Sequence, residues 1–259
     1  LIMPIQFAND PLLLFTHAAN KTALYGPFWI LLTSIPFVLG FGQFLITLFN
    51  FKLLILAFYL LTSYLIYKVS KNTQGLILFA LNPLVVLESL MGTHNDIAMM
   101  FFAIASLYLF KNKKVLFGLI FLLLSIFIKF ATIFLIPVFI FLFIQNIKGR
   151  QIKWDKVFLI SSISMFAIFL LSSLREEIYP WYGIWFLIFI PFINNSFLKG
   201  FYLSLSIGLL LRYIPYMYLG TYFGPTPILK IVLMLTPVFL FLTYKVVKIG
   251  INSRLVKKS

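Results

Sequence analysis

The chain contains no cysteine, which excludes disulfide bonds and thiol chemistry. Charged residues are scarce, at 10% of the sequence, and only 6 residues are acidic. Two histidines are too few for a multi-histidine metal site. The sequence also lacks a glycine-rich phosphate loop, a metal-ligand spacing and a nucleophile motif. We therefore predict no cofactor and no metal-ligating residues, although the sequence leaves a divalent metal ion open.

Most of the chain consists of long apolar runs. Hydrophobic residues make up 62% of the chain and the mean hydropathy is +1.06, values typical of a polytopic helical membrane protein. Several runs are shorter than the roughly 20 residues of a straight span, and short broken helices at a membrane face are tolerated where they line a polar cavity. We predict an all-α transmembrane bundle with about eight spans. The apolar runs cover residues 27–50, 51–67, 75–91, 97–110, 115–128, 130–145, 157–174, 181–193, 200–218 and 227–247.

The net charge of +15 does not indicate a nucleic-acid partner, because the basic residues lie in short loops between apolar runs. With the loop at Lys68 and Lys71 in the cytoplasm, 15 of the 21 basic residues fall on that side and five of the 6 acidic residues fall on the other. This asymmetry predicts the orientation of the bundle. The opposite, extracytoplasmic side then receives Lys21, Lys52, Lys129, Arg175, Arg212 and Lys230, with Asp10, Glu88, Asp96, Glu176 and Glu177.

The same orientation predicts on which side of the membrane each end of the chain lies. Residues 1–26 mix polar and apolar side chains and are predicted to form an extracytoplasmic loop, and residues 27–259 form a transmembrane domain whose C-terminus is cytoplasmic. The run at 27–50 must then return to its starting side, and its glycines and Pro36 favour a re-entrant hairpin or an interfacial helix. Because the chain begins at Leu1, we expect a first helix upstream of it.

The most informative polar cluster is His94-Asn95-Asp96, which lies between two apolar runs just after Gly92. Polar groups at such a junction are costly in a membrane unless they face water or serve a site. His94 suits an anionic group such as a phosphate, Asp96 suits a hydrogen bond or a proton, and the helix that follows adds a partial positive charge. The alternative is a simple helix N-cap, which explains one of the three residues.

Two basic residues outside this cluster are expected on the same face. Lys129 interrupts an apolar stretch at an outer turn, and Arg212 lies near the outer end of the run at 200–218. Both suit the phosphate of a lipid-linked donor, whereas the alternative is that they snorkel to the interface. Glu88 is expected to pair with one of the basic residues.

A third outer stretch combines charge with aromatic rings. Arg175-Glu176-Glu177 precedes Tyr179-Pro180-Trp181-Tyr182, and Trp185 follows. Carboxylates can bind sugar hydroxyls and ring faces can stack on a sugar, so we predict a sugar or acceptor site formed by Glu176, Glu177, Tyr179, Trp181 and Tyr182. The alternative is an aromatic belt at the membrane interface, and Trp185 fits that belt best.

Taken in chain order, five motifs resemble those of polytopic glycosyltransferases of the GT-C fold, in particular the bacterial polyprenyl-phosphate-mannose-dependent mannosyltransferases. The resemblance covers most of the chain, from about Asn9 to Arg212, and the ordered set is more specific than any single motif. The motifs are Tyr25-Gly26-Pro27-Phe28-Trp29, Leu81-Asn82-Pro83-Leu84, His94-Asn95-Asp96, Lys129 with Thr132 and Pro137, and Pro180-Trp181-Tyr182.

The resemblance implies hexosyl or mannosyl transfer from a polyprenyl-phosphate sugar to a glycan, glycolipid or protein at the extracytoplasmic face of a bacterial plasma membrane. In such enzymes a carboxylate of the first outer loop deprotonates the acceptor, and basic residues stabilise the departing lipid phosphate. We therefore expect Asp96 or Asp10 as the catalytic carboxylate, or one upstream of Leu1. His94, Lys129 and Arg212 would bind the donor phosphate, and Asn95 and Tyr25 would join the sugar-binding residues.

Two other classes of function remain open from the sequence. A transporter or flippase of a lipid-linked or anionic solute would need polar residues that continue into the cytoplasmic half of the helices, where this chain has mainly Leu, Ile and Phe. A non-catalytic membrane scaffold would not require His94, Lys129 and Arg212 to converge.

Overall fold

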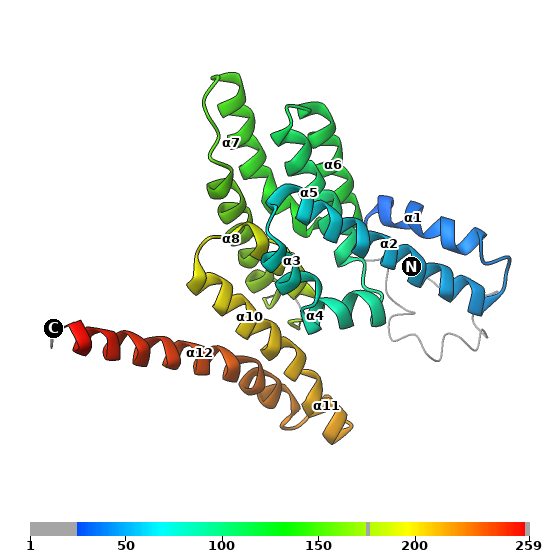
Figure 1. The fold of residues 1–259 in the computed structure, drawn as a ribbon. Helices are drawn as coiled ribbons and strands as arrows, with labels where there is room; N and C mark the ends of the chain where they lie inside the picture. Colours follow the sequence, from blue (N-terminus) through cyan, green and yellow to red (C-terminus); the bar gives the residue numbers. More distant parts are fainter. Residues whose placement is uncertain (1–24, 175–176, 257–259) are drawn as a thin grey trace.

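The computed structural model describes residues 25–174 and 177–256, and every regular element in these residues is helical. The predicted all-α class is therefore confirmed. Figure 1 shows a bundle of helices of unequal length, from which the last helix extends away. Helices suit this chain because a helix satisfies its own backbone hydrogen bonds, which lipid cannot do.

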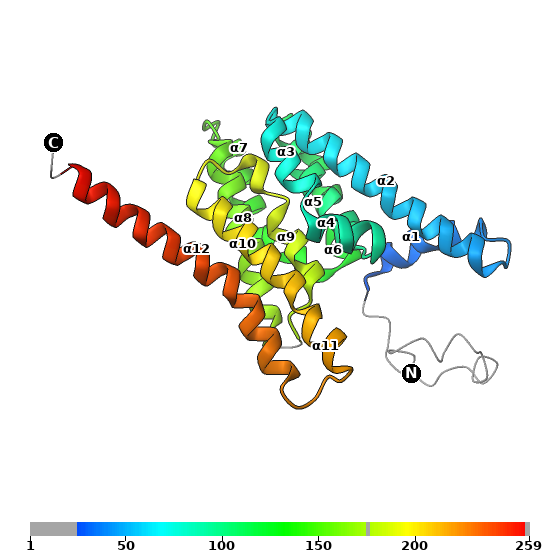
Figure 2. The ribbon, with the colours of Figure 1, turned by 60° about the horizontal axis from the view of Figure 1, so that its bottom comes forward.

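The first two helices form a hairpin that projects from one side of the bundle (Figures 1 and 2). Helix α1 spans Pro27–Val38 and packs against α2, which spans Phe44–Ser70. The predicted division between runs at residues 50 and 51 is wrong, because α2 continues unbroken through it. The break falls instead at 39–43, where Phe41 and Gly42 take φ values of 49° and 74° that end the helix. The observed hairpin extends to Ser70, beyond the predicted segment 27–50, and whether residues 27–50 re-enter the membrane or lie at its interface stays a prediction.

The run predicted at 75–91 is broken in the middle. Helix α3 (Thr73–Ala80) and the following stretch from Pro83 to Met91 are bent by 55° at Asn82. The side chain of Asn82 accepts a hydrogen bond from the backbone N–H of Leu84 and donates one of 3.0 Å to the Ser206 hydroxyl. Asn82 therefore caps the second piece, α4 (Pro83–Val86), and ties it to a distant helix.

Helix α5 (Asp96–Lys111) is the centre of the bundle, and twelve of its residues are buried. It is connected to α4 by a π-helical turn, η3 (Leu87–Met91), and packs against α2 and α6 (Val115–Ile128). At the end of α6, Ser125 donates a hydrogen bond of 2.8 Å to the carbonyl of Met99 on α5. Because α5 is enclosed, the residues at its N-terminus are held between several elements.

The next elements bring Lys129 and the aromatic stretch to this same end of α5. A 3₁₀ turn, η4 (Phe130–Leu135), leads into α7 (Ile136–Ile147), and α8 (Trp154–Ser172) returns. The stretch predicted at 181–193 is then three short pieces, of which the first begins at Pro180 and the last contains Pro191. They are η5 (Pro180–Gly183), α9 (Ile184–Leu187) and η6 (Ile190–Phe192), and α9 packs against α5.

The last three helices close one side of the bundle. Helix α10 (Ser196–Leu211) continues through Arg212 into the short α11 (Tyr213–Leu219), and α12 (Thr226–Val256) folds back along α10. Gly208 permits this contact, because a Cβ there would lie 2.0 Å from the carbonyl oxygen of Met234. Figure 2 shows that the C-terminal part of α12 leaves the bundle and extends outward.

Five helices of the described residues are long and apolar enough to cross a membrane. The bent pair α3 and α4–η3 would make a sixth if it crosses as one span. The protein is thus a polytopic membrane protein, and the predicted total of about eight spans stays a prediction. The five long helices cover Phe44–Ser70, Phe130–Ile147, Trp154–Ser172, Ser196–Leu219 and Thr226–Gly250.

Candidate functional site

A buried ion pair lies at the N-terminus of α5. The Lys129 ammonium is 3.0 Å from Oδ1 of Asp96, and Asp96 is completely buried. The indole N–H of Trp185 donates a hydrogen bond to the same oxygen, while Oδ2 of Asp96 has no hydrogen-bond partner among the described residues. Three elements, α5, the α6–η4 junction and α9, therefore converge on one carboxylate.

Two aromatic rings shield this ion pair. The Lys129 ammonium lies 4.4 Å from the ring centroid of Tyr182 and 5.3 Å from that of Trp185, within range of cation–π attraction. The rings of Tyr182 and Trp185 are themselves stacked, with centroids 4.2 Å apart. The lysine is thus held by one carboxylate and two ring faces, in an environment that excludes most water.

Beside the ion pair, three rings form a stack. The His94 ring is stacked on Trp181 with centroids 3.9 Å apart, and Tyr179 is stacked on Trp181 at 4.5 Å. Two rings at these distances would overlap if they shared one face of the indole, so His94 and Tyr179 occupy opposite faces. Trp181 therefore has no open ring face on which a sugar could stack.

Glu88 connects the ring stack to α11. One carboxylate oxygen of Glu88 lies 3.3 Å from Nε2 of His94, and the other accepts a hydrogen bond of 2.8 Å from the hydroxyl of Tyr213. Glu88 is buried in the π-helical turn η3, which points its side chain toward both partners. Glu88 thus contacts His94 and Tyr213 rather than Lys129 or Arg212, which pair with Asp96 and Glu177 instead.

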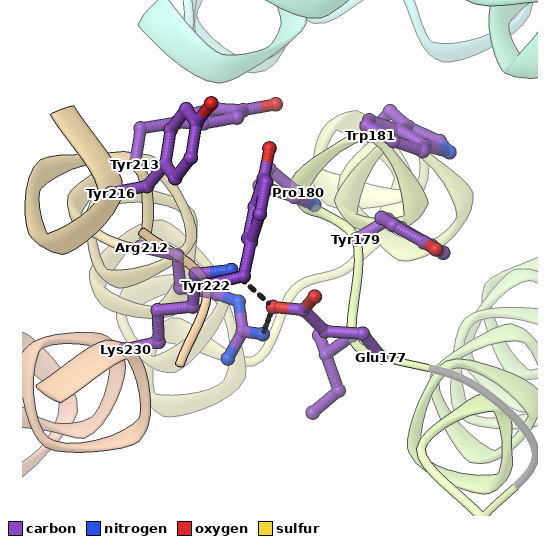
Figure 3. A pocket seen from close by; sticks show the side chains of 10 residues that line it. Glu177, Tyr179, Pro180, Trp181, Arg212, Tyr213, Tyr216, Tyr222 and Lys230 are labelled. Atoms are coloured by element: carbon purple, nitrogen blue, oxygen red, sulfur yellow. Dashed lines mark hydrogen bonds and ion pairs between the residues drawn. The ribbon is translucent and has the colours of Figure 1, made fainter. Parts of the chain in front are cut away.

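An open pocket of about 150 Å³ lies on the other side of the ring stack. Figure 3 shows Arg212 and Lys230 directed at the same carboxylate oxygen of Glu177 in this pocket. Arg212 and Lys230 are both 2.8 Å from Oε1 of Glu177, and Arg212 is nearly fully buried while Glu177 is partly exposed. The remaining lining is mainly aromatic: Ile178, Tyr179, Pro180, Trp181, Tyr213, Tyr216 and Tyr222.

These contacts place most of the predicted site residues in one continuous network. The ion pairs between lysine or arginine and acidic side chains of the described residues all belong to it, as does the contact of Glu88 with His94. The residues predicted to bind the donor phosphate do not lie together in this network. Lys129 pairs with Asp96, whereas Arg212 lies at the open pocket. Asp10 and Glu176, two further predicted site residues, lie outside the described residues.

Two predicted sugar-binding residues lie at the edge of this network. Asn95 is buried, and its side-chain nitrogen has no hydrogen-bond partner among the described residues. Tyr25 is 46% exposed, and the N–H of the next residue, Gly26, bonds to the carbonyl of Ile128 directly before Lys129. The pKa of Tyr25 is raised by partial burial and, as a smaller effect, by the negative charge of Asp96. The phenol therefore lies within electrostatic reach of the buried ion pair.

Several members of the network were not predicted. Trp185 is buried and bonds to Asp96, so its expected place in an aromatic belt is wrong. Lys230 and Tyr213 were not assigned to the site, although the charge asymmetry already placed Lys230 on the outer face. No periodicity in the sequence could have paired them with Glu177 and Glu88, which lie 53 and 125 residues away.

Burial controls the charge of His94. It lowers the pKa of the imidazole, an effect that the negative charge of Asp96 opposes and the positive charge of Lys129 supports. His94 is therefore neutral at pH 7 and can donate one hydrogen bond and accept another. Within residues 25–174 and 177–256, no three His, Asp or Glu side chains are close enough to hold a metal ion.

The fold and the site together define a polytopic membrane protein whose polar and charged groups gather at one end of an otherwise apolar bundle. Comparison with known families identifies the chemistry. Residues 16–145, about half of the chain, match the family model described as alpha-(1->6)-mannopyranosyltransferase, N-terminal domain. The chain belongs to this family, and it is a membrane glycosyltransferase, a mannosyltransferase of the GT-C type. No curated protein and no solved structure compared with the chain matches it.

Family membership decides between the classes of function left open by the sequence. The chain is an enzyme, so neither a transporter nor a non-catalytic scaffold is needed to explain its polar network. The matched residues include Glu88, His94, Asp96 and Lys129, whereas the open pocket with Arg212 and Lys230 lies beyond them.

Proposed function

We propose that the protein transfers a mannosyl group from a polyprenyl-phosphate-linked donor to a glycan or glycolipid acceptor at the extracytoplasmic face of the membrane. The observation that carries this proposal is the convergence of Arg212 and Lys230 on one oxygen of Glu177 inside an aromatic pocket. A phosphate diester carries one negative charge, as the Glu177 carboxylate does, and would replace this carboxylate as the partner of both cations. We include the α-(1→6) linkage that the family description names.

In this proposal the donor phosphate binds Arg212 and Lys230, and the sugar lies toward His94 and Lys129. The acceptor oxygen forms a bond to the anomeric carbon while the bond from that carbon to the phosphate oxygen breaks. Arg212 and Lys230 stabilise the negative charge that develops on the departing polyprenyl phosphate. Neutral His94 and the Lys129 ammonium offer hydrogen bonds to sugar hydroxyls, which replaces their predicted role at the phosphate.

The acceptor hydroxyl must give its proton to a carboxylate. Asp96 can accept it only at Oδ2, because Oδ1 is already bonded to Lys129 and Trp185. Since Asp96 is buried, we propose that its main contribution is to position Lys129, and that Asp10 or another carboxylate of the same outer loop is the base. D10N and D96N separate these roles, because only loss of the base should abolish the fall of kcat at acid pH while leaving donor binding intact.

The proposal that the site faces the extracytoplasmic side rests on the distribution of basic residues along the chain. The network contains acidic and basic residues in pairs, whereas 15 of the 21 basic residues fall in loops expected at the other membrane face. Because positive charge is retained on the cytoplasmic side, the network is expected on the outer side of a bacterial plasma membrane.

The decisive experiment measures transfer of radiolabelled mannose from a polyprenyl-phosphate donor by the full-length protein in proteoliposomes. R212A and K230A should each weaken donor binding by about 10- to 100-fold, the value of a charge-assisted bond to phosphate. K245A removes a lysine from the same helix as Lys230 and serves as the matched control. Unchanged donor binding in R212A and K230A would remove the phosphate from this pocket, and absence of mannosyl transfer by the wild-type protein would refute the proposed function.

A further inference from the structure

The backbone directly before His94 has two unusual features. Residues Leu87–Met91 form a π-helical turn, a rare conformation that occurs often at functional sites. Thr93 then takes a φ of 57°, in the left-handed region that β-branched residues rarely adopt. Such conformations persist only where the surrounding structure holds them, so the turn at Gly92 and Thr93 needs an external restraint.

Lys52, on α2, supplies such a restraint on the turn at Gly92 and Thr93. Its ammonium donates a hydrogen bond of 3.2 Å to the carbonyl of Met91 and lies 3.5 Å from the hydroxyl of Thr93. The Met91 carbonyl is at the end of a helical turn, where such groups lack helical partners and attract positive charge. Lys52 is not a member of any ion pair among the described residues, so its described polar contacts are with this turn.

A shift of this turn would move His94. A Cβ added to Gly92 would lie 2.8 Å from Cδ2 of His94 and 3.0 Å from the Glu88 carbonyl oxygen, so the imidazole packs directly on the glycine backbone. The N–H of His94 also donates to the carbonyl of Glu88 at 3.1 Å. The position of the turn therefore fixes where the imidazole sits on Trp181.

We propose that Lys52 is a positioning residue for mannosyl transfer, because its bonds to Met91 and Thr93 hold the strained turn that places His94 on Trp181. This inference rests on the proposed function in one respect, namely that His94 serves the reaction. Lys52 touches none of the reacting groups and acts through the turn. A lysine that only extends to the membrane interface would have no such effect.

A double-mutant cycle with Thr93 tests this role. K52M should lower kcat about tenfold with little change in the KM for donor, because loss of the restraint costs an amount comparable to local backbone strain. K52R keeps a cationic donor at the turn and should restore at least half of the activity. T93G removes the strain, so K52M in the T93G background should cost no more than about threefold.

K68M is the matched control, since it removes a lysine near the opposite end of the same helix and should leave kcat unchanged. Equal losses from K52M in the wild-type and T93G backgrounds, together with no restoration by K52R, would overturn the proposal. Melting temperatures of all variants show whether the protein is folded, and a general loss of folding would not be relieved by T93G.

A readout without substrate separates this inference from the proposed function. In protein labelled at histidine and carrying H17Q, NMR follows the titration of His94 alone. Burial lowers the pKa of His94, Asp96 raises it and Lys129 lowers it, with Glu88 in direct contact. Release of the turn in K52M should expose the imidazole and shift its titration to higher pH, whereas K52R should keep the wild-type value. An unchanged titration in K52M would overturn the positioning role even if mannosyl transfer is confirmed.

Discussion

Asp96 and Lys129 form a buried charge pair, and neither charge can be removed alone without leaving the other in an apolar environment. D96N should lower the free energy of unfolding by about 3 kcal/mol, because Lys129, whose side chain is only 18% exposed, would lose its counter-charge. The double variant D96N/K129M should recover most of the melting temperature, since both charges are gone, but not the transfer activity. Thermal unfolding in detergent, measured beside the transfer assay, checks both statements, and equal melting temperatures for D96N and wild type would contradict them.

Burial of His94 predicts how the stability of the protein depends on pH. Its pKa in the folded protein is lowered by burial below the ordinary value of about 6.5, so the unfolded chain binds more protons than the folded protein below that pH. The stability that this difference contributes is fully present above about pH 6.5 and is lost as the pH falls through the folded pKa. Between pH 7 and pH 5 the melting temperature of the wild type should therefore fall further than that of H94Q.

The other histidine gives the control for this measurement. H17Q should retain the acid-induced loss of stability seen in the wild type, because His94 is unchanged. A parallel fall in the melting temperatures of H94Q and wild type would show that the buried imidazole does not control this loss.

At the scale of the elements, residue patterns predicted where most helices lie but not how they break. The runs at 97–110 and 115–128 correspond closely to α5 and α6, since loop lysines and glycine mark their ends. The run at 75–91 conceals a bend at Asn82, which caps a second helix through the N–H of Leu84, and the bond that ties this bend to the distant Ser206 could not be predicted from the sequence. The run was divided at Asn50, yet a single polar residue does not stop a helix, and α2 continues through it to Ser70.

For the site, the polar residues could be predicted from the sequence, but most of their partners could not. His94, Asp96 and Lys129 stand out because polar residues in an apolar chain are costly, and the structure joins them in one network. Their partners could not be predicted, since the pairing of Glu177 with Lys230 depends on how α12 folds back on α10. Trp185 was misplaced for a similar reason: its buried bond to Asp96 arises only when α9 meets α5.

The contact between α10 and α12 gives a prediction for an element pair. G208A should lower the melting temperature, at a cost of about 1–3 kcal/mol, because its Cβ would collide with the Met234 carbonyl and force the two helices apart. It should also weaken donor binding, since Lys230 on α12 would move from Glu177. G250A is the matched control in α12, where a Cβ meets no atom within 4 Å and the melting temperature should not fall. Equal melting temperatures for G208A and G250A would contradict the close contact.

At the scale of the whole molecule, the absence of cysteine makes membrane orientation simple to measure. Single cysteines can be introduced at Lys113, between α5 and α6, and at Tyr222, between α11 and α12. In intact bacterial cells, an impermeant maleimide should label Y222C directly and K113C only after the membrane is opened, if the network faces outward. The reverse labelling pattern would place the site in the cytoplasm, and the unmodified chain provides a cysteine-free background.

The sandwich of Trp181 between His94 and Tyr179 also has an optical consequence. A protonated imidazole in contact with an indole quenches its fluorescence by accepting an electron, whereas a neutral imidazole quenches it weakly, so the emission of this tryptophan should fall as the pH drops through the lowered pKa of His94. At such acid pH, any ligand that opens the stack would brighten the emission. With the other three tryptophans replaced by phenylalanine, the protein would report the arrival of an unlabelled donor through its own fluorescence.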